Sequence, residues 1–278
     1  MKVAIVGLGL MGGSLGLCLK ENKFISCVKG YDIDKENANL ALKRGLIHEL
    51  MDEFSVEMLS SCDIVVLATP VDAIVSLLPS LETLPQNTTI IELGSTKGAI
   101  VAATPPSLKP RTIYAHPMRG TENSGAGAAF EGFYENVVCV LCDSERAEAA
   151  HQKRAVEFLS SVGMKIVFMN SRDHDHHAAI ISHLPHAISF ALANFVMKEE
   201  DKREIVHLAG GSFRDMSRIA KSSPAMWESI FLQNKGNLIK SIEHFQKELE
   251  FCKQMIANED KAALNSWMSA ANTLREFL

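Results

Sequence analysis

Residues 114–125 read YAHPMRGTENSG, and His116 in this run is the first candidate for chemistry. The preceding run RTIYA is typical of a strand, and Pro117 and Gly120 interrupt regular structure, so His116 is expected at a strand's carboxyl end. An imidazole in such a place can be a working general base, or a loop residue that only caps backbone groups. Which of these two roles His116 has depends on the other residues that lie near the same strand end.

A glycine-rich run near the amino terminus is the second feature with chemical meaning. Its G-x-G-x-x-G spacing follows an apolar strand-like run and opens a helix-like stretch, the context in which this motif predicts dinucleotide binding. The glycines permit a tight turn and a close approach of a pyrophosphate, whose charge the helix amino terminus attracts. The expected cofactor-binding residues are Gly7, Leu8, Gly9, Leu10, Met11 and Gly12.

Asp32 bears on the choice of cofactor. It ends the next strand-like run, 20 residues after Gly12, where a carboxylate accepts hydrogen bonds from the ribose hydroxyls. The same carboxylate repels the 2′-phosphate of NADP, so the sequence predicts NAD. Lys29 and Lys35 are nearby cations that would favour a phosphate, and a higher kcat/KM with NADP would overturn the assignment.

Further polar residues follow other predicted strands. Thr69 and Pro70 close the run LATP, Ser95 lies in ELGSTKG, and His116 closes a third run. Ligands of open α/β sheets bind at the carboxyl ends of the strands. Three strand ends therefore converge on one crevice, which favours a working role for His116 and adds Thr69 and Pro70 to the cofactor site.

The elements that position these residues alternate along the first part of the chain. Strands are predicted at 2–7, 26–32, 62–70, 87–94, 112–116, 136–142 and 164–169, with helical stretches at 11–22, 35–44, 71–83 and 144–161. This alternation predicts a mostly parallel sheet covered on both faces. After residue 170 only helical periodicity continues. The predicted fold class is α/β, with a Rossmann-type dinucleotide-binding domain at 1–169 and an all-helical domain at 170–278.

Composition excludes several classes of protein. The chain has 278 residues, a net charge of −5 and no Lys/Arg-rich run, so nucleic acid is not an expected partner. No run of about 18 apolar residues predicts a membrane span, and the glycine spacing argues against a signal peptide. Six scattered cysteines suit a reducing compartment, and the expected location is the cytoplasm.

Two clusters invite metal or redox interpretations that the sequence does not favour. Cys139 and Cys142 lie in a predicted strand, where side chains three residues apart point to opposite faces. The run HDHH at 174–177 matches neither the H-E-x-x-H pattern nor a Cys/His ligand spacing. We expect a polar helix amino terminus there and no metal site.

Six motifs together resemble one family over essentially the whole chain. They are GLGLMGGSLG, ATP, GSTKG, HPMRGTENSG, SHLPHAISFAL and GGSFRDMSRIAKSSPAMW. The chain resembles the prephenate/arogenate dehydrogenase family of tyrosine biosynthesis, and the last three motifs are the specific ones. The resemblance implies a Rossmann domain followed by a helical dimerisation domain. It also implies an oxidative decarboxylation in which a cyclohexadienol gives hydride to NAD and loses CO2.

The resemblance also implies roles for single residues. His116 matches the family's catalytic histidine, which accepts the proton of the ring hydroxyl, and Ser95 matches a serine that contacts this hydroxyl and the histidine. Arg218 matches an arginine that binds a substrate carboxylate with its fork. His186 is the candidate for a substrate carboxylate and His183 for orienting its neighbours, and both lie on one helical face. Without the resemblance, both histidines and the arginine would be ordinary helix residues.

Substrate choice depends on the loop after His116. Thr121 and Glu122 match pocket-facing family positions, and a carboxylate there would favour the ammonium of arogenate. Arg119 departs from many relatives, and its charge could offset Glu122. We expect prephenate, with arogenate as the alternative. Trp227 is expected either to wall the pocket of its own or of a partner subunit, or to lie in the core.

Two readings outside this family stay open. One is a hydroxyacid-type dehydrogenase on the same plan, although no lysine–asparagine pair of the kind such enzymes use is evident. The other is an NAD-binding redox sensor without turnover. The apolar faces of the long helices exceed what one small sheet can cover, which predicts a homodimer through the helical domain.

Overall fold

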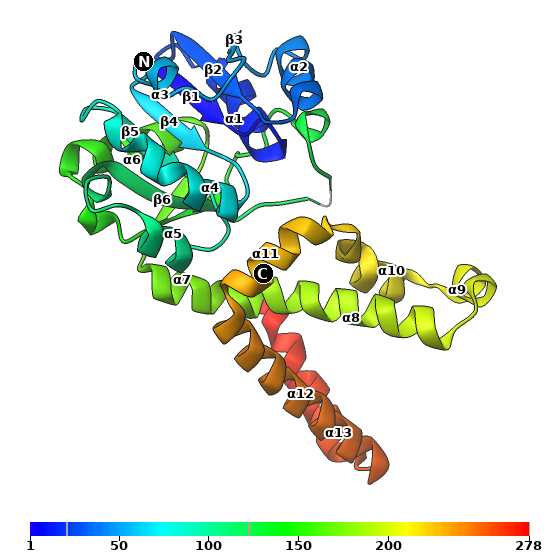
Figure 1. Ribbon diagram of the computed structural model, residues 1–278. Coiled ribbons are helices and arrows are strands. Elements are labelled where there is room, and N and C mark those ends of the chain that lie inside the picture. Colours follow the sequence, from blue (N-terminus) through cyan, green and yellow to red (C-terminus); the bar gives the residue numbers. More distant parts are fainter. Residues whose placement is uncertain (21, 122, 278) are drawn as a thin grey trace. The chain divides into compact units, whose positions relative to one another are not determined.

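The computed structural model describes residues 1–20, 22–121 and 123–277 (Figure 1). The chain forms two compact units, Met1–Asn234 and Lys235–Leu278. The first unit holds a sheet and the helices that follow it to Gln233, and the second holds helices alone. The predicted class, an α/β domain followed by helices, is confirmed.

The described residues form one eight-stranded sheet with the order β3-β2-β1-β4-β5-β6-β7-β8. All neighbouring strands are parallel except β6 and β7, which are antiparallel. Chain order reverses between β1 and β4, the switch point where doubly wound folds bind ligands. The strands are β1 (Lys2–Val6), β2 (Cys27–Tyr31), β3 (Glu49–Leu50), β4 (Ile64–Leu67), β5 (Thr89–Glu92), β6 (Thr112–Pro117), β7 (Val138–Cys142) and β8 (Lys165–Met169).

Helices cover both faces of this sheet, because side chains of successive strand residues point to opposite faces. Val3 and Ile5 of β1 belong to one buried cluster with residues of α1 and α6, and Ala4 and Val6 belong to another with residues of α4 and α5. The helical elements here are α1 (Leu10–Lys20), α2 (Lys35–Lys43), α3 (Val56–Leu59), α4 (Val71–Leu77), η1 (Leu78–Thr83), α5 (Gly98–Ala103), η2 (Lys109–Arg111), η3 (Ala126–Ala128), η4 (Ser144–Arg146) and α6 (Ala149–Ser161).

The remaining helices of the first unit begin directly after β8. They are α7 (Ser171–Ala178), η5 (Ala179–His183), α8 (Leu184–Glu199), α9 (Lys202–Leu208), α10 (Gly211–Ser217), η6 (Arg218–Lys221) and α11 (Pro224–Gln233). The turn η5 has π-helical hydrogen bonding and lies just before Pro185. Proline cannot donate the regular bond to the carbonyl four residues earlier, and the wider turn absorbs this loss within a continuous helix.

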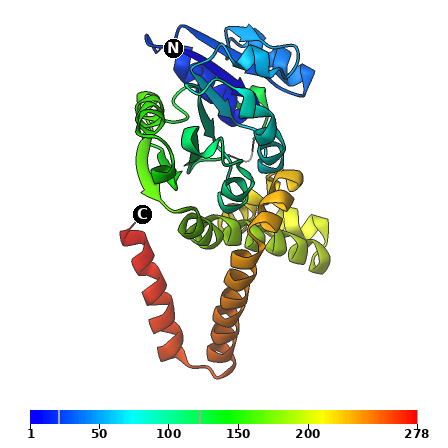
Figure 2. The same cartoon turned by 60° about the vertical axis from the view of Figure 1, so that its left-hand side comes forward.

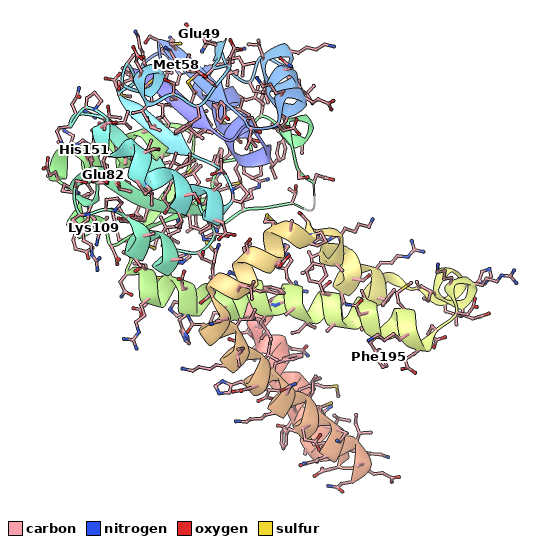
Figure 3. All side chains as sticks on the ribbon, in the orientation of Figure 1. Glu49, Met58, Glu82, Lys109, His151 and Phe195 are labelled. Carbon is pink, nitrogen blue, oxygen red and sulfur yellow. The ribbon has the colours of Figure 1, made fainter. Side chains whose placement is uncertain are left out.

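The continuous helix Ser171–Glu199 is, by length and composition, the one described helix apolar enough to cross a membrane. Only 11% of its most apolar window is buried in the chain. Figure 3 labels Phe195 on α8, and its side chain is 60% exposed. The helix therefore carries apolar surface that this single chain leaves uncovered.

The second unit is a helical hairpin. Figure 2 shows α12 (Lys235–Ala257) and α13 (Lys261–Asn272) running in opposite directions, with the short turn η7 (Thr273–Glu276) after them. Asp260 caps α13 by accepting a hydrogen bond from the amide of Ala263 at 2.9 Å. Trp267 of α13 donates to Glu248 of α12 at 3.2 Å.

Candidate active site at the carboxyl ends of the strands

The loop from β1 to α1 has the geometry that its glycines predict. Gly7 has φ +94°, a left-handed conformation that favours glycine, and its amide donates to the carbonyl of Tyr31 at 2.8 Å. A Cβ at Gly12 would lie 1.9 Å from the carbonyl oxygen of Gly7, whereas one at Gly9 would meet no atom within 4 Å. Gly12 thus allows the turn to close, and Gly9 faces open space beside the α1 amino terminus.

Asp32 follows β2 and is held in a fixed orientation. Its Oδ2 accepts hydrogen bonds from the amide of Leu8 at 2.8 Å and from Nδ2 of Asn37 at 2.7 Å. Lys29 pairs with Glu49 at 3.7 Å, and Lys35 donates to the Asp52 carbonyl at 3.4 Å. Both lysines thus have partners of their own, and the carboxylate is the group fixed beside the glycine loop.

Thr69 provides an independent sign of a ligand at this edge. Its hydroxyl oxygen is buried and has no hydrogen-bond partner among the described residues. Pro70, beside it, occupies the N-cap position of α4. A buried hydroxyl without a partner costs free energy unless a ligand or water completes it. The open space at Gly9, the Asp32 carboxylate and this hydroxyl are the features that a dinucleotide requires, so the residues fit NAD.

His116 is the next-to-last residue of β6, at the same edge, and is the first of three hydrogen-bonded side chains. Its Nδ1 lies 2.8 Å from Nε2 of His174, and Nδ1 of His174 lies 2.9 Å from Oδ1 of Asp175. The carboxylate of Asp175 also accepts the amides of Lys97 and Gly98, each at 2.8 Å. The imidazole is therefore anchored, through α7, to the loop between β5 and α5.

Burial sets the protonation of this chain of side chains. Desolvation, with the electrostatic effects of His174, Lys97 and His183, holds the pKa of His116 well below its usual value. Burial by itself raises the pKa of Asp175, but the hydrogen bonds from His174, Lys97 and Gly98 outweigh it and lower that pKa. His116 is thus a neutral base at pH 7 and Asp175 an ionised acceptor.

A buried ion pair contacts the end of β6. Lys97 and Glu92 are fully buried and paired, and the Lys97 ammonium also donates to the carbonyl of Ala115 at 2.8 Å. Burial raises the pKa of Glu92, against the opposing effect of Lys97. The pair fixes the backbone directly before His116.

The helical side of the site is built around Trp227 of α11. The ring of His186 stacks on it with centroids 3.6 Å apart and an interplanar angle of 22°, and His183 meets it edge-on at 6.0 Å. The indole nitrogen of Trp227 is buried without a hydrogen-bond partner among the described residues. Trp227 is 6% exposed, which agrees with either expectation for it, pocket wall or core.

The pKa values of neighbouring groups connect Arg218, His186, His183 and His116, because each influences the next. Desolvation lowers the pKa of His183 to about 4, with His174 and His186 contributing, and desolvation followed by Arg218 lowers the pKa of His186. Nδ1 of His183 lies 3.2 Å from Nδ2 of Asn234, and Nδ1 of His186 donates to the Ser182 carbonyl at 2.9 Å. The exposed Arg218 thus lies near His186, as expected for a shared ligand.

The other predicted residues are less closely tied to His116. Ser95 is half-buried after β5, and within the described part of the chain its hydroxyl makes no hydrogen bond. The hydroxyl of Thr121 accepts the amide of Asn123 at 3.2 Å. Glu122 lies outside the described residues. Arg119 donates to the Phe133 carbonyl at 2.7 Å and stacks over that ring at 5.3 Å, so its charge is directed at the chain itself.

Sequence reasoning missed His174 and Asp175. Both lie in the HDHH run, which was expected to be a polar helix amino terminus. Both are buried, and His174 is hydrogen-bonded to His116. The described residues contain no group of three or more His, Cys, Asp or Glu side chains that could hold a metal. Their burial next to His116 is what marks them as part of the site. This burial follows from the docking of α7, which the sequence does not show.

Two family models match adjacent stretches of the chain. The prephenate dehydrogenase nucleotide-binding domain matches residues 15–168, and the prephenate dehydrogenase dimerization domain matches residues 170–270. The prephenate dehydrogenase of Bacillus subtilis (strain 168) is 31% identical over 281 residues, which cover 99% of this chain and 76% of that protein.

Two solved structures share the fold over nearly the full length. Prephenate dehydrogenase from Aquifex aeolicus, in complex with hydroxyphenyl propionate and NAD+, has a TM-score of 0.92 at 32% identity, with 99% of this chain and 97% of that chain covered. Arogenate dehydrogenase from Synechocystis has a TM-score of 0.82 at 28% identity, with 99% of each chain covered.

Proposed function

We propose that this chain, which belongs to the prephenate dehydrogenase family, oxidises and decarboxylates prephenate with NAD, producing 4-hydroxyphenylpyruvate for tyrosine biosynthesis. The observation that carries the proposal is His116, a desolvated imidazole at the sheet edge that also holds the dinucleotide loop. The relatives named prephenate dehydrogenase support the substrate.

The cofactor would be held by residues that follow β1, β2 and β4. The amino terminus of α1 and the space at Gly9 receive the pyrophosphate, Asp32 accepts the ribose hydroxyls, and Thr69 offers its buried hydroxyl. When bound, NAD accepts the hydride that leaves the substrate ring. The Asp32 carboxylate favours NAD over NADP.

His116 acts on the hydroxyl of the ring. Its neutral imidazole accepts the hydroxyl proton while the hydrogen on the same carbon leaves with its electron pair as hydride. The bond to the ring carboxylate then breaks, CO2 departs, and the electron pair of that bond makes the ring aromatic. The former carbonyl oxygen becomes a phenolate, which takes the proton back from His116. General-base help of this kind is worth about 10²–10⁴-fold. Ser95, near the Lys97 loop, is proposed to contact the same hydroxyl.

The helical residues hold the substrate's carboxylates. Arg218 offers a guanidinium fork. His186 donates its Nδ1 proton to Ser182, so its Nε2 can donate to a carboxylate only when the ring is protonated, which a bound anion favours. His183 orients this group from the π-helical turn. Thr121 and Glu122 are proposed to contact the substrate, because both match pocket-facing positions of the family. Arogenate is the second candidate substrate, favoured by the arogenate dehydrogenase of Synechocystis at 28% identity and by a carboxylate at Glu122.

Absorbance at 340 nm on mixing the protein and NAD with prephenate, arogenate or a simple hydroxyacid tests the proposal. We expect the highest kcat/KM with prephenate. Turnover of hydroxyacids alone, or NAD binding without turnover of any of the three, would overturn it. His116→Asn is expected to reduce kcat by about 10²–10⁴-fold with KM nearly unchanged, and an unchanged kcat would remove His116 from the mechanism.

The functional unit is proposed to be a cytoplasmic homodimer. The helical residues match a dimerization domain, and the exposed apolar side chains of Ser171–Glu199 need a cover. A second copy of the same helix provides one, because isologous contacts pair a surface with itself. We propose the domain division at 169/170, with substrate binding and dimerisation both assigned to residues 170–278.

A further inference from the structure

We infer that His174 and Asp175 form a positioning pair that fixes the proton of the His116 imidazole on Nδ1 and leaves Nε2 as the bare lone pair that accepts the substrate's proton. The inference rests on the proposed function, which needs a basic ring nitrogen but does not say which one. Neither residue of the pair is expected to touch the substrate. Both act through His116.

The direction of the first hydrogen bond follows from Asp175. An ionised carboxylate is only an acceptor, and the amides of Lys97 and Gly98 already donate to its two oxygens at 2.8 Å. The His174 nitrogen 2.9 Å from Oδ1 must therefore carry a proton. Asp175 thus places the His174 proton on Nδ1.

The second hydrogen bond transmits this choice to His116. When each ring carries one proton, His174 has a lone pair on Nε2, which faces Nδ1 of His116 at 2.8 Å. Nδ1 of His116 must then donate, and its Nε2 is unprotonated. The opposite tautomer would set two lone pairs against each other at this distance. A histidine's partner at one nitrogen selects the form of the other, as the orienting carboxylate does in Ser-His-Asp triads.

The pair is built to be rigid. His174 is 3% exposed, and α7 is fixed at its start because Asn170 caps it by accepting the amide of Asp173, at 2.8 Å. Ser171 then donates its hydroxyl and its amide to Asp143, at 2.8 and 2.9 Å. His177 lies on the same helix but is exposed, so it provides a matched control.

The tautomer can be measured without any substrate. In protein labelled with ¹⁵N-histidine, long-range proton–nitrogen correlation spectra separate protonated from bare ring nitrogens, and the signal missing in His116→Gln assigns the ring. We expect Nδ1 of His116 to be protonated in the wild type and in His177→Phe, and the proton to leave Nδ1 in His174→Phe. A wild-type proton on Nε2 would overturn the inference, whether or not prephenate is turned over.

Kinetics tests whether the tautomer matters. His174→Phe keeps a ring but removes the acceptor, so kcat should fall by about 10²-fold or more while KM changes by less than about 3-fold. His174→Gln places a carbonyl oxygen that can accept from Nδ1 and should regain at least about 10-fold in kcat. Wild-type kcat in His174→Phe, or no gain in His174→Gln, would contradict the inference. If His174→Phe does not fold, the wild-type tautomer of His116 still decides.

Discussion

The histidines of this chain differ in their surroundings more than in their sequence context. His116 is half-buried with a lowered pKa and one ring partner, His186 is stacked on Trp227, and His176 and His177 are exposed. A strand end predicted a site role for His116, and a family motif predicted one for His186. The sequence could not assign their partners, because burial and ring contacts depend on the packed helices.

The lowered pKa of His116 predicts the pH dependence of the reaction. A base works only when unprotonated, so activity is lost as pH falls through the pKa of His116, which burial, His174, Lys97 and His183 hold below 6.5. We expect kcat/KM, which reports the free enzyme, not to decline as pH is lowered past 6.5 and to decline only at more acidic values. Reassay at neutral pH after acid incubation controls for unfolding. A decline centred at or above pH 6.5 would contradict this.

Arg218 predicts a different kinetic effect. A lysine keeps the charge but lacks the planar fork that holds a carboxylate at two points. Arg218→Lys should therefore raise KM for prephenate by about 10-fold or more, as expected for the loss of a charge-assisted hydrogen bond, and lower kcat much less. Arg214→Lys, on the preceding turn, is the control and should leave both constants unchanged. An unaltered KM in Arg218→Lys would reassign this arginine to the surface.

Elements with strong periodicity were predictable, and short or contact-dependent ones were not. The seven predicted strands all occur, and the central ones, such as β1 and β4, are the continuous apolar runs typical of buried parallel strands. The two-residue β3 and the short α3 and α5 were missed, since a few residues carry no period. The docking of α7 against His116 was missed. It depends on the hydrogen bond between Ser171 and Asp143, which are 28 residues apart in the chain.

The loop between β1 and α1 predicts opposite results for two glycines. Gly12→Ala would place a methyl group 1.9 Å from the Gly7 carbonyl, so it should lower the melting temperature and weaken NAD binding together. Gly9→Ala meets no atom within 4 Å, so the fold should melt as the wild type does while the NAD Kd rises about 10-fold or more, because the methyl group occupies the pyrophosphate's approach. Calorimetry and NAD titration of both variants test this, and an unchanged Kd in Gly9→Ala would contradict it.

At the scale of the molecule, the sheet of the first unit buries its apolar side chains, but the longest helix of that unit does not. Both faces of the sheet have buried clusters, whereas Ile180, Ile181, Phe195 and Met197 of the helix are 44% to 66% exposed. Large apolar surfaces of this kind are rare on monomers in water. We therefore expect a second copy of the chain to cover this surface.

This exposed apolar surface predicts the state of the protein in solution and a variant that changes it. Light scattering should give about twice the chain mass of 30.5 kDa at micromolar concentration. Phe195→Asp places two charges in a symmetric interface and should raise the dimer Kd by about 10²-fold or more. Phe24→Asp is the control, because Phe24 is 79% exposed in the nucleotide-binding part, and it should leave the mass unchanged. A monomeric wild type, or equal effects of the two variants, would show that this helix face serves another purpose.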